Sequence, residues 1–346
     1  MTHADGRIAA NSPARRVAEN TPARRIAENT QARRIAVLGG TGFVGRAVCE
    51  RLVRRSAAGA VVVPTRRAMH ADSVRALPSV DVRVADVHDD AALHSVLDGC
   101  DTVINLVAIL HGSAAAFEQV HVGLPRRLAA ACVRLGIRRV VHVSALGVGP
   151  GTSRYLRSKT EGEAVLHACG LDLTILRPSV MFGAQDRFLN LFARLQALTP
   201  VMPLACSDAR FQPVWVEDVA EALVRCIDTP ATIGQTIECA GPEVCTLAEL
   251  VRLAGRWSGH ERPILPLPRA LGRLQALAME WLPGEPLMSR DNLDSMQVPN
   301  VAGGVLPGLD WLGIKPASLA QIAPGYLGHH DGRAQLDALR ARAQRS

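Results

Sequence analysis

The sequence predicts an α/β fold, with a doubly wound parallel sheet followed by a smaller C-terminal α/β lobe. From Arg34 onward, short runs rich in β-branched residues alternate with helical patterns, a rhythm typical of parallel sheets with helices on both faces. A glycine-rich loop directly follows the first of these runs. The 346 residues suffice for one large domain and a smaller appended lobe.

Strands and helices can be assigned along most of the chain. Strands are expected at 34–38, 60–65, 80–85, 102–108, 138–143 and 172–177, and helices at 43–54, 89–98, 114–135 and 154–168. Beyond Ser179 we expect a strand near 211–216, a helix capped by Asp218, a strand near 235–240 and a helix at 246–257. The chain is therefore divided into a repeat leader at 1–33, a sheet domain at 34–180, a substrate lobe at 181–328 and a flexible tail at 329–346.

The N-terminus holds a nine-residue repeat whose third copy runs into the first strand. The copies are Asn11–Glu19, Asn20–Glu28 and Asn29–Val37. The first two carry prolines and have no partner strands in view, so they predict a disordered leader. An Arg-rich transit peptide is the alternative, although the acidic residues and the scarcity of serine count against it.

The net charge of +7 is concentrated in that leader. Residues 1–34 hold seven arginines and three acidic residues, which gives +4 and leaves +3 for the other 312 residues. The rest of the chain is close to neutral, so we expect no nucleic-acid partner. Eight scattered cysteines without a C-x-x-C pair, and the lack of a secretory signal, indicate reduced thiols in a cytoplasmic-type compartment and no metal site.

The glycine-rich loop Gly39-Gly40-Thr41-Gly42-Phe43-Val44-Gly45 lies between the first strand and the first helix. In this context Gly39 permits the tight turn, Gly42 lets the backbone approach a pyrophosphate, and Gly45 lets the helix pack against the sheet. The N–H groups at the helix N-terminus would bind the anion. The loop predicts a Rossmann-type domain whose nicotinamide dinucleotide contacts Gly39, Thr41, Gly42, Phe43, Val44 and Gly45.

The end of the second strand indicates which dinucleotide binds. An NAD-specific protein places Asp or Glu here to bind the ribose 2′-hydroxyl, whereas this chain has Arg66 and Arg67. Two guanidinium groups suit a 2′-phosphate, so NADPH is favoured over NADH; a solvated basic turn is the alternative. Further cofactor contacts are expected at the ends of the third and fourth strands, from Asp86, Val87, Leu106, Val107 and Ala108.

The candidate catalytic residues are Tyr155, Lys159 four residues on, and Ser144 at the end of the fifth strand. Residues four apart share a helix face, so the ammonium is expected beside the phenol, where it would lower the phenol's pKa, while Ser144 holds a carbonyl oxygen. The chain has 37 arginines but only two lysines, which suggests that a titratable ammonium is required at Lys159. Two helix-surface residues without a function are the alternative.

A proline-punctuated stretch from Pro263 to Pro286 places Leu267, Leu271, Leu274, Ala278 and Leu282 on one helical face. Such a face most often packs in the core. A helix that lies on a membrane or binds a partner is the alternative.

These motifs resemble the short-chain dehydrogenase/reductase family, in its extended and atypical branch. The resemblance rests on the glycine loop, Ser144, the Tyr155–Lys159 pair and Arg177-Pro178-Ser179. It implies that Lys159, Pro178 and Ser179 contact the cofactor. More narrowly, several stretches are similar to bacterial relatives of the nucleotide-binding accessory subunit of respiratory complex I: Val61–Arg67, Tyr155–Glu163, Phe211–Ala220, Ala240–Glu243 and Ser289–Asn300. The chain departs from the commoner family pattern at His121, where many relatives have Asn, and at Cys206-Ser207-Asp208, where relatives often have a glycine-rich stretch.

The resemblance implies tightly bound NADPH and association with complex I, with quinone metabolism or with the inner face of an energy-transducing membrane. An NADPH-dependent oxidoreductase acting on a small carbonyl or quinone-like substrate is the first hypothesis, because the Tyr155–Lys159 pair is intact. A non-catalytic NADPH-binding accessory or assembly subunit is the second, and the leucine-rich face favours it. A sensor of the NADPH/NADP ratio is the third.

Overall fold

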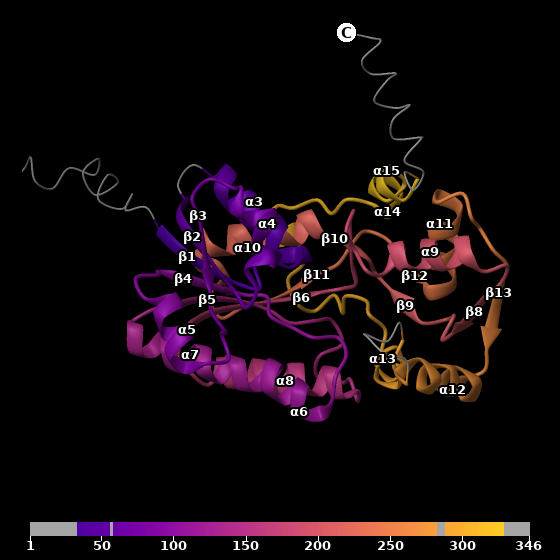
Figure 1. Cartoon of the computed structure of the whole chain (residues 1–346), viewed down its shortest axis with the longest axis horizontal. Helices are drawn as coiled ribbons and strands as arrows, with labels where there is room; N and C mark the ends of the chain where they lie inside the picture. Colours follow the sequence, from indigo (N-terminus) through magenta and orange to yellow (C-terminus); the bar gives the residue numbers. More distant parts are fainter. Residues whose placement is uncertain (1–32, 56–57, 282–287, 329–346) are drawn as a thin grey trace, which may run out of the picture.

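The computed structural model describes residues 33–55, 58–281 and 288–328, and its centre is a seven-stranded sheet (Figure 1). The strands are β1 (Arg33–Leu38), β2 (Ala58–Thr65), β3 (Val80–Val84), β4 (Thr102–Asn105), β5 (Arg139–Val143), β6 (Asp172–Pro178) and β11 (Thr236–Cys239). They lie in the order β11-β6-β5-β4-β1-β2-β3, and every neighbouring pair is parallel. The predicted fold class is confirmed. All carboxyl ends meet at one edge, where such sheets bind ligands.

Helices cover both faces of the sheet (Figure 1). One face carries α3 (Phe43–Arg54), α10 (Val216–Asp228), the short α4 (Asp72–Arg75) and the 3-10 turn η1 (Ala68–Ala71). The other carries α5 (Asp90–Leu97), α7 (Leu124–Leu135) and α8 (Arg154–His167). Central strands are buried on both sides, so they read as continuous apolar runs such as Val61, Val62 and Val63. Each such buried side chain contributes roughly 1.5–3 kcal/mol.

The smaller lobe combines short strand pairs with helices and lies at the right of Figure 1. Its strands are β8 (Met202–Ala205), β9 (Arg210–Phe211), β12 (Cys245–Thr246) and β13 (Ile264–Leu267); β7 (Met181–Phe182) and β10 (Val214–Trp215) pair nearer the sheet. Its helices are α9 (Leu189–Leu198), α11 (Leu247–Trp257), α12 (Arg269–Glu280), α13 (Arg290–Ser295), α14 (Leu319–Ile322) and α15 (Pro324–Leu327). Short 3-10 turns are η3 (Pro230–Thr232) and η4 (Asp310–Leu312). The helix expected at 246–257 is present, begun by a capping box of Thr246 and Glu249.

The placement of β11 and α10 corrects the sequence-based expectation, which put both in the substrate lobe. β11 pairs with β6 at the sheet edge, and α10 packs against α3 on the sheet. Arg51 on α3 reinforces this contact through ion pairs to Glu217 and Glu221, at 3.0 and 2.7 Å. The chain therefore leaves the sheet after β6 and returns to it before the lobe is complete.

Four local expectations also differ from the structure. β4 ends at Asn105 instead of 108, because the Asn105 side chain accepts a hydrogen bond from Val107 N and turns the chain. The helix expected at 114–135 is α6 (Ala114–Glu118) and α7 joined by a π-helical turn, η2 (Gln119–Gly123). Pro213 lies between β9 and β10, which replace the single strand expected near 211–216. Asp218 does not cap α10, since the helix begins two residues earlier and the Asp218 carboxylate accepts from Ala317 N.

The two leucines of the predicted face that lie in α12 face solvent, so the core interpretation is wrong for this helix, whereas Leu267 at the end of β13 packs against a small core cluster. Leu271 and Leu274 are 52% and 61% exposed, while Gly272 and Ala276 form the buried face. Gly272 is required there because a Cβ would lie 2.5 Å from the Ala205 side chain. Within the part of the chain that the structure describes, none of the helices combines the length and apolar character needed to cross a bilayer. The repeat leader, Leu282 and the tail lie outside the described residues.

Candidate active site

The glycine loop lies at the carboxyl end of β1, as its position in the sequence predicts. Gly39 has φ +82°, a left-handed conformation in which a side chain would be strained. A Cβ on Gly45 would lie 2.2 Å from Gly39 O, so α3 packs directly on the loop. A Cβ on Gly42 would approach only Gly39 O, at 3.2 Å, and its other side is open. Glycine is thus needed for the turn and for helix packing.

The N-terminus of α3 suits an anion. No side chain caps this twelve-residue helix, whose N-cap is Gly42, although caps normally satisfy the free N–H groups of a first turn. Uncapped N–H groups, the helix dipole and the open side of Gly42 together provide what a dinucleotide pyrophosphate requires. The residues present therefore fit the cofactor that the glycine pattern indicates.

Arg66 and Arg67 follow β2 at the same edge of the sheet, and both are exposed. Thr65 Oγ1 donates to Arg67 O at 3.0 Å and shapes the turn. Within residues 33–55, 58–281 and 288–328, neither guanidinium forms an ion pair. Asp86 and Val87 follow β3, where Asp86 Oδ1 accepts from His88 N and Val87 is buried.

The next expected cofactor contacts follow β4 and β6. Leu106, Val107 and Ala108 form the loop after β4 and become more exposed towards Ala108. Ser179 differs from expectation, because its hydroxyl donates to Asn300 and its backbone N–H to Cys239 O. Both hydrogen-bond donors of Ser179 are therefore occupied within the protein. Pro178, the residue before it, is a buried strand residue and has no N–H.

Helix α8 presents the candidate catalytic side chains and is fixed along its length. Ser153 begins the helix, and its side chain accepts from Leu156 N. Further along, Glu163 forms a two-pronged ion pair with Arg177 on β6. The Glu163 side chain is 6% exposed, and breaking a buried pair of this kind is costly. This ion pair ties α8 to β6.

Lys159 lies between α8 and the end of β5, and only 2% of it is exposed. Its Nζ donates to Val143 O at 3.0 Å. Burial lowers the pKa of Lys159 to about 8, although nearby Glu163 opposes the shift. The ammonium thus titrates close to neutral pH.

Tyr155 has a pKa shifted in the opposite direction from our expectation. Burial raises the pKa of Tyr155 to about 12, because its ring packs edge-on against His121 and Phe117, with centroid distances of 5.5 and 6.2 Å. The Lys159 ammonium donates instead to a backbone carbonyl. Tyr155 is therefore a protonated phenol over the physiological pH range, which suits a proton donor.

Ser144 follows β5, where its N–H donates to Leu176 O and holds it against β6. The residue is 3% exposed, yet its Oγ has no hydrogen-bond partner within the described part of the chain. A buried unsatisfied hydroxyl in a native fold requires an explanation, and a ligand that accepts its hydrogen bond is one.

His121, noted in the sequence only as a departure from the family, joins the cofactor side of the site to α8. Its Nε2 accepts from Ile109 N at 3.1 Å, and its Nδ1 lies 2.8 Å from Ser158 Oγ. Because Nε2 accepts, the ring proton belongs on Nδ1. Burial, and then the charge of Lys159, lowers the pKa of His121 to about 3. The π-helical turn η2 places His121 against α8. The carbonyl oxygen of His121 comes so close to α8 that a Cβ on Gly162 would not fit.

The burial of His121 predicts a pH-dependent stability. Between pH 6.5 and about 3 the unfolded chain takes up a proton at this residue that the folded protein does not, so stability falls as pH falls through that window. From pH 7.5 to 5, the parent should lose about 2 kcal/mol more unfolding free energy than His121→Asn. Urea denaturation at both pH values measures this, with His167→Asn on the exposed end of α8 as control. Equal losses in the parent and His121→Asn would contradict it.

Within residues 33–55, 58–281 and 288–328, no three His, Cys, Asp or Glu side chains gather as a metal site. The cysteines described at 49, 100, 132, 226 and 239 are buried.

Comparison with known proteins agrees with this arrangement. The NAD dependent epimerase/dehydratase family matches residues 35–240. Mitochondrial NADH dehydrogenase (ubiquinone) 1 alpha subcomplex subunit 9 of Rattus norvegicus is 32% identical over 295 residues, covering 82% of this chain and 76% of the relative. The mitochondrial NADH-ubiquinone oxidoreductase 40 kDa subunit of Neurospora crassa is 27% identical over 306 residues, covering 87% and 80% of the two chains.

Among solved structures, an NADPH-dependent quinone oxidoreductase of Escherichia coli complexed with NADPH has the same fold, with a TM-score of 0.70 at 22% identity. The alignment covers 85% of this chain and 99% of that chain. The family match begins in β1 and ends just after β11, so it spans the whole seven-stranded sheet. The chain belongs to the NAD dependent epimerase/dehydratase family.

Proposed function

We propose that this protein is an NADPH-dependent reductase acting on a small carbonyl or quinone-like substrate. The observation that carries the proposal is the buried, unpaired hydroxyl of Ser144 at the sheet edge that also holds the glycine loop. Leaving such a donor unsatisfied costs about 1–3 kcal/mol. A substrate oxygen that accepts its hydrogen bond accounts for it.

Bound NADPH would supply a hydride to the substrate carbon. Ser144 Oγ donates a hydrogen bond to the substrate oxygen and orients it. Tyr155, whose raised pKa keeps it protonated, transfers its phenolic proton to that oxygen. The Lys159 ammonium stabilises the resulting tyrosinate and binds the nicotinamide ribose hydroxyls. His121 remains neutral and fixes the distance between the loop after β4 and α8.

The first experiment asks which nucleotide the protein holds and whether the protein consumes it. We expect purified protein to carry or bind NADPH, and the 340 nm absorbance to fall when a carbonyl or quinone acceptor is added. Boiled protein with NADPH and the same acceptors controls for spontaneous oxidation. Persistence of the absorbance with every acceptor, despite bound NADPH, would move the assignment to the second candidate.

The second candidate is a non-catalytic NADPH-binding accessory subunit of an NADH:quinone oxidoreductase. Two observations favour it: the relatives described above are subunits of that enzyme by name, and α12 exposes Leu271 and Leu274. Co-purification separates the two candidates, because an accessory subunit should elute with a larger assembly. Tyr155→Phe should leave that association and NADPH binding unchanged.

Cofactor preference follows from the two arginines after β2. We expect NADPH to bind more tightly than NADH, and Arg66→Ala to weaken NADPH about 10- to 100-fold, because one charge-assisted contact is worth about 1.5–3 kcal/mol. NADH affinity should stay within about twofold of the parent value if the lost contact is to the 2′-phosphate alone. Calorimetric titration measures both, with Arg75→Ala on the nearby exposed helix α4 as a charge-matched control. Equal NADPH and NADH affinities in the parent would refute the 2′-phosphate assignment.

A further inference from the structure

The segment Ser289–Asn300 links the smaller lobe to the candidate active site. Its helix α13 contacts both α12 and the catalytic helix α8 (Figure 1). Ser289 and Asn292 form a capping box that begins α13 and fixes its orientation. The segment then runs to Asn300, which is bridged to Phe211.

Asp291 on α13 caps the N-terminus of α8. Its two carboxylate oxygens accept from Arg154 N at 2.8 Å and from Tyr155 N at 3.1 Å. The carboxylate comes from 137 and 136 residues away in the sequence, and the side chain is only 10% exposed. With Ser153 accepting from Leu156 N, the first three N–H groups of α8 are all satisfied by side chains. A buried carboxylate at this end of the helix is also favoured by the helix dipole.

A third hydrogen bond ties α13 to the same turn, and the far end of the segment is also anchored. Ser295 Oγ donates to Ser153 Oγ at 2.8 Å. Asn300 Oδ1 accepts from Ser179 Oγ at 2.7 Å and from Val180 N at 2.8 Å. One segment of twelve residues thus holds the start of α8 and the end of β6 in a fixed relation.

The position of the Tyr155 hydroxyl depends on these caps. Within the described part of the chain the phenol makes no hydrogen bond, and its ring is held by packing, edge-on against His121 and Phe117 and against a cluster of Ala145, Val148 and Leu156. Tyr155 is the second residue of α8, in the turn that frays most readily when caps are lost. One of the two backbone N–H groups that Asp291 binds belongs to Tyr155 itself.

We propose that Asp291 is a positioning residue, through which the smaller lobe sets the location of the Tyr155 phenol. The Asp291 carboxylate holds the backbone of Arg154 and Tyr155, so the phenol is placed for proton transfer only when α13 is docked on α8. This assignment rests on the proposed reductase function for its effect on turnover, whereas the placement of the phenol can be observed without turnover.

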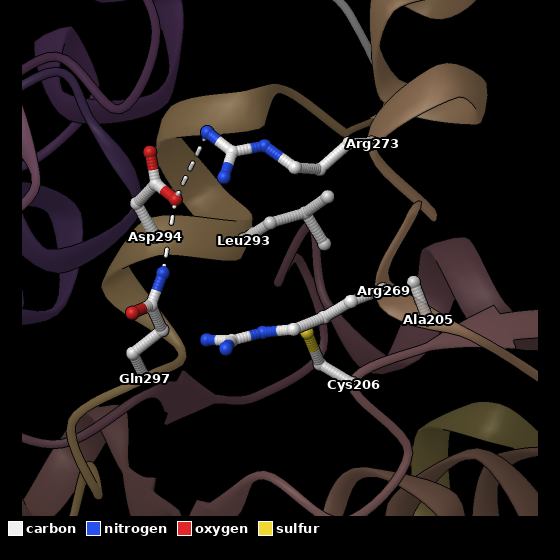
Figure 2. A pocket seen from close by; sticks show the side chains of 7 residues that line it. All are labelled: Ala205, Cys206, Arg269, Arg273, Leu293, Asp294 and Gln297. Atoms are coloured by element: carbon white, nitrogen blue, oxygen red, sulfur yellow. Dashed lines mark hydrogen bonds and ion pairs between the residues drawn. The ribbon is translucent and has the colours of Figure 1, made fainter. Parts of the chain in front are cut away.

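A matched control is available on the side of α13 that faces α12. Asp294 faces a small pocket between α13, α12 and the end of β8, where it pairs with Arg273 at 3.5 Å and accepts from Gln297 Nε2 at 3.0 Å (Figure 2). Asp294→Ala therefore removes the same charge from the same helix without removing a cap from α8.

The test uses tyrosine labelled with ¹³C at the ring carbon that bears the hydroxyl. The chain contains only Tyr155 and Tyr326, so two resonances are expected, and Tyr155→Phe assigns them. Tyr326 is an internal reference because its hydroxyl is bound to Asp186 at 2.8 Å. In the full-length protein, Asp291→Ala should shift or broaden the Tyr155 resonance and leave that of Tyr326 unchanged. Asp294→Ala should move neither.

Turnover provides the second readout. Asp291→Ala should lower kcat roughly 10- to 100-fold, since a displacement of about 1 Å of a reacting group has an effect of this size, and the Kd for NADPH should remain that of the parent. If Asp291→Ala does not fold, Asp291→Asn serves, because its amide keeps one acceptor and should shift the Tyr155 resonance by a smaller amount. A Tyr155 resonance unchanged in whichever of the two variants folds would overturn the assignment.

The two proposals fail in different ways. If Asp291→Ala shifts the Tyr155 resonance but the parent oxidises no NADPH, the positioning role is supported and the reductase is contradicted. If the parent is an active enzyme and Asp291→Ala changes neither the Tyr155 resonance nor kcat, only the positioning role is contradicted.

Discussion

Tyr155→Phe should lower the turnover number about 10²- to 10⁴-fold, which is the usual contribution of a positioned general acid. The substitution removes only the hydroxyl, and the ring contacts with His121 and Phe117 are retained. Thermal stability and NADPH affinity should therefore stay close to the parent values. Steady-state oxidation of NADPH with the best acceptor measures the loss.

Tyr326→Phe is the control for this variant, because it removes the only other phenol hydroxyl of the chain. It breaks the hydrogen bond to Asp186, so it should lower stability by about 1 kcal/mol and leave kcat unaltered. Parent-like turnover in Tyr155→Phe would remove the phenol from the mechanism.

Lys159→Met should impair both turnover and NADPH binding, because one ammonium serves both. It keeps the aliphatic stem in the buried site and removes the charge along with the hydrogen bond to Val143 O. The loss of one charged hydrogen bond weakens NADPH by about 10- to 100-fold. Fluorescence titration of NADPH measures affinity, and kcat is measured at saturating cofactor. Lys315→Met, at the only other lysine, is the control and should change neither.

The pKa of about 8 gives Lys159 a pH signature in the cofactor-free protein. The Lys159 cation is present below this pH and lost as pH rises through it, so if it binds the ribose as we propose, NADPH affinity should decline above about pH 8 in the parent. In Lys159→Met the affinity should be low and the decline absent. A parent affinity that is flat between pH 7 and 9.5 would contradict this role.

Features that depend on local pattern could be predicted from the sequence. The glycine loop, the strand before it and the helix after it are contiguous, so the turn, the close approach and the dipole can be inferred from one stretch. Tyr155 and Lys159 are four residues apart on a capped helix, and Ser144 ends a β-branched run. The strands are parallel, so their carboxyl ends share one edge of the sheet. Knowing that the glycine loop and Ser144 each follow a strand was therefore enough to place both at that edge.

Features that depend on contacts between distant residues could not be predicted in this way. The sequence Thr-Ile-Glu-Cys at 236–239 indicates a strand but not its partner, so its pairing with β6 was missed. The pKa of Tyr155 was expected to fall because only its spacing from Lys159 was considered. Its rise follows from the packing of Phe117 and His121, which belong to another helix.

Hydrogen bonds between residues far apart in the sequence also determine details of the site that local patterns could not predict. Ser179 has the right position for a cofactor contact, yet Asn300 occupies its hydroxyl from 121 residues away. The stretch Ser289–Asn300 was noted as a point of resemblance without a role, because no local pattern indicates that Asp291 caps a helix that begins at Arg154.

The central claim is that bound NADPH is consumed here by a reaction that needs the Tyr155 proton. Single-turnover stopped-flow measurement tests it most directly, with parent and Tyr155→Phe both preloaded with NADPH and then mixed with carbonyl and quinone acceptors. We expect equal NADPH loading, rapid loss of the 340 nm absorbance in the parent, and loss at least about 100-fold slower in Tyr155→Phe. Decay at the same rate in both proteins, or no decay in the parent with any acceptor, would contradict it.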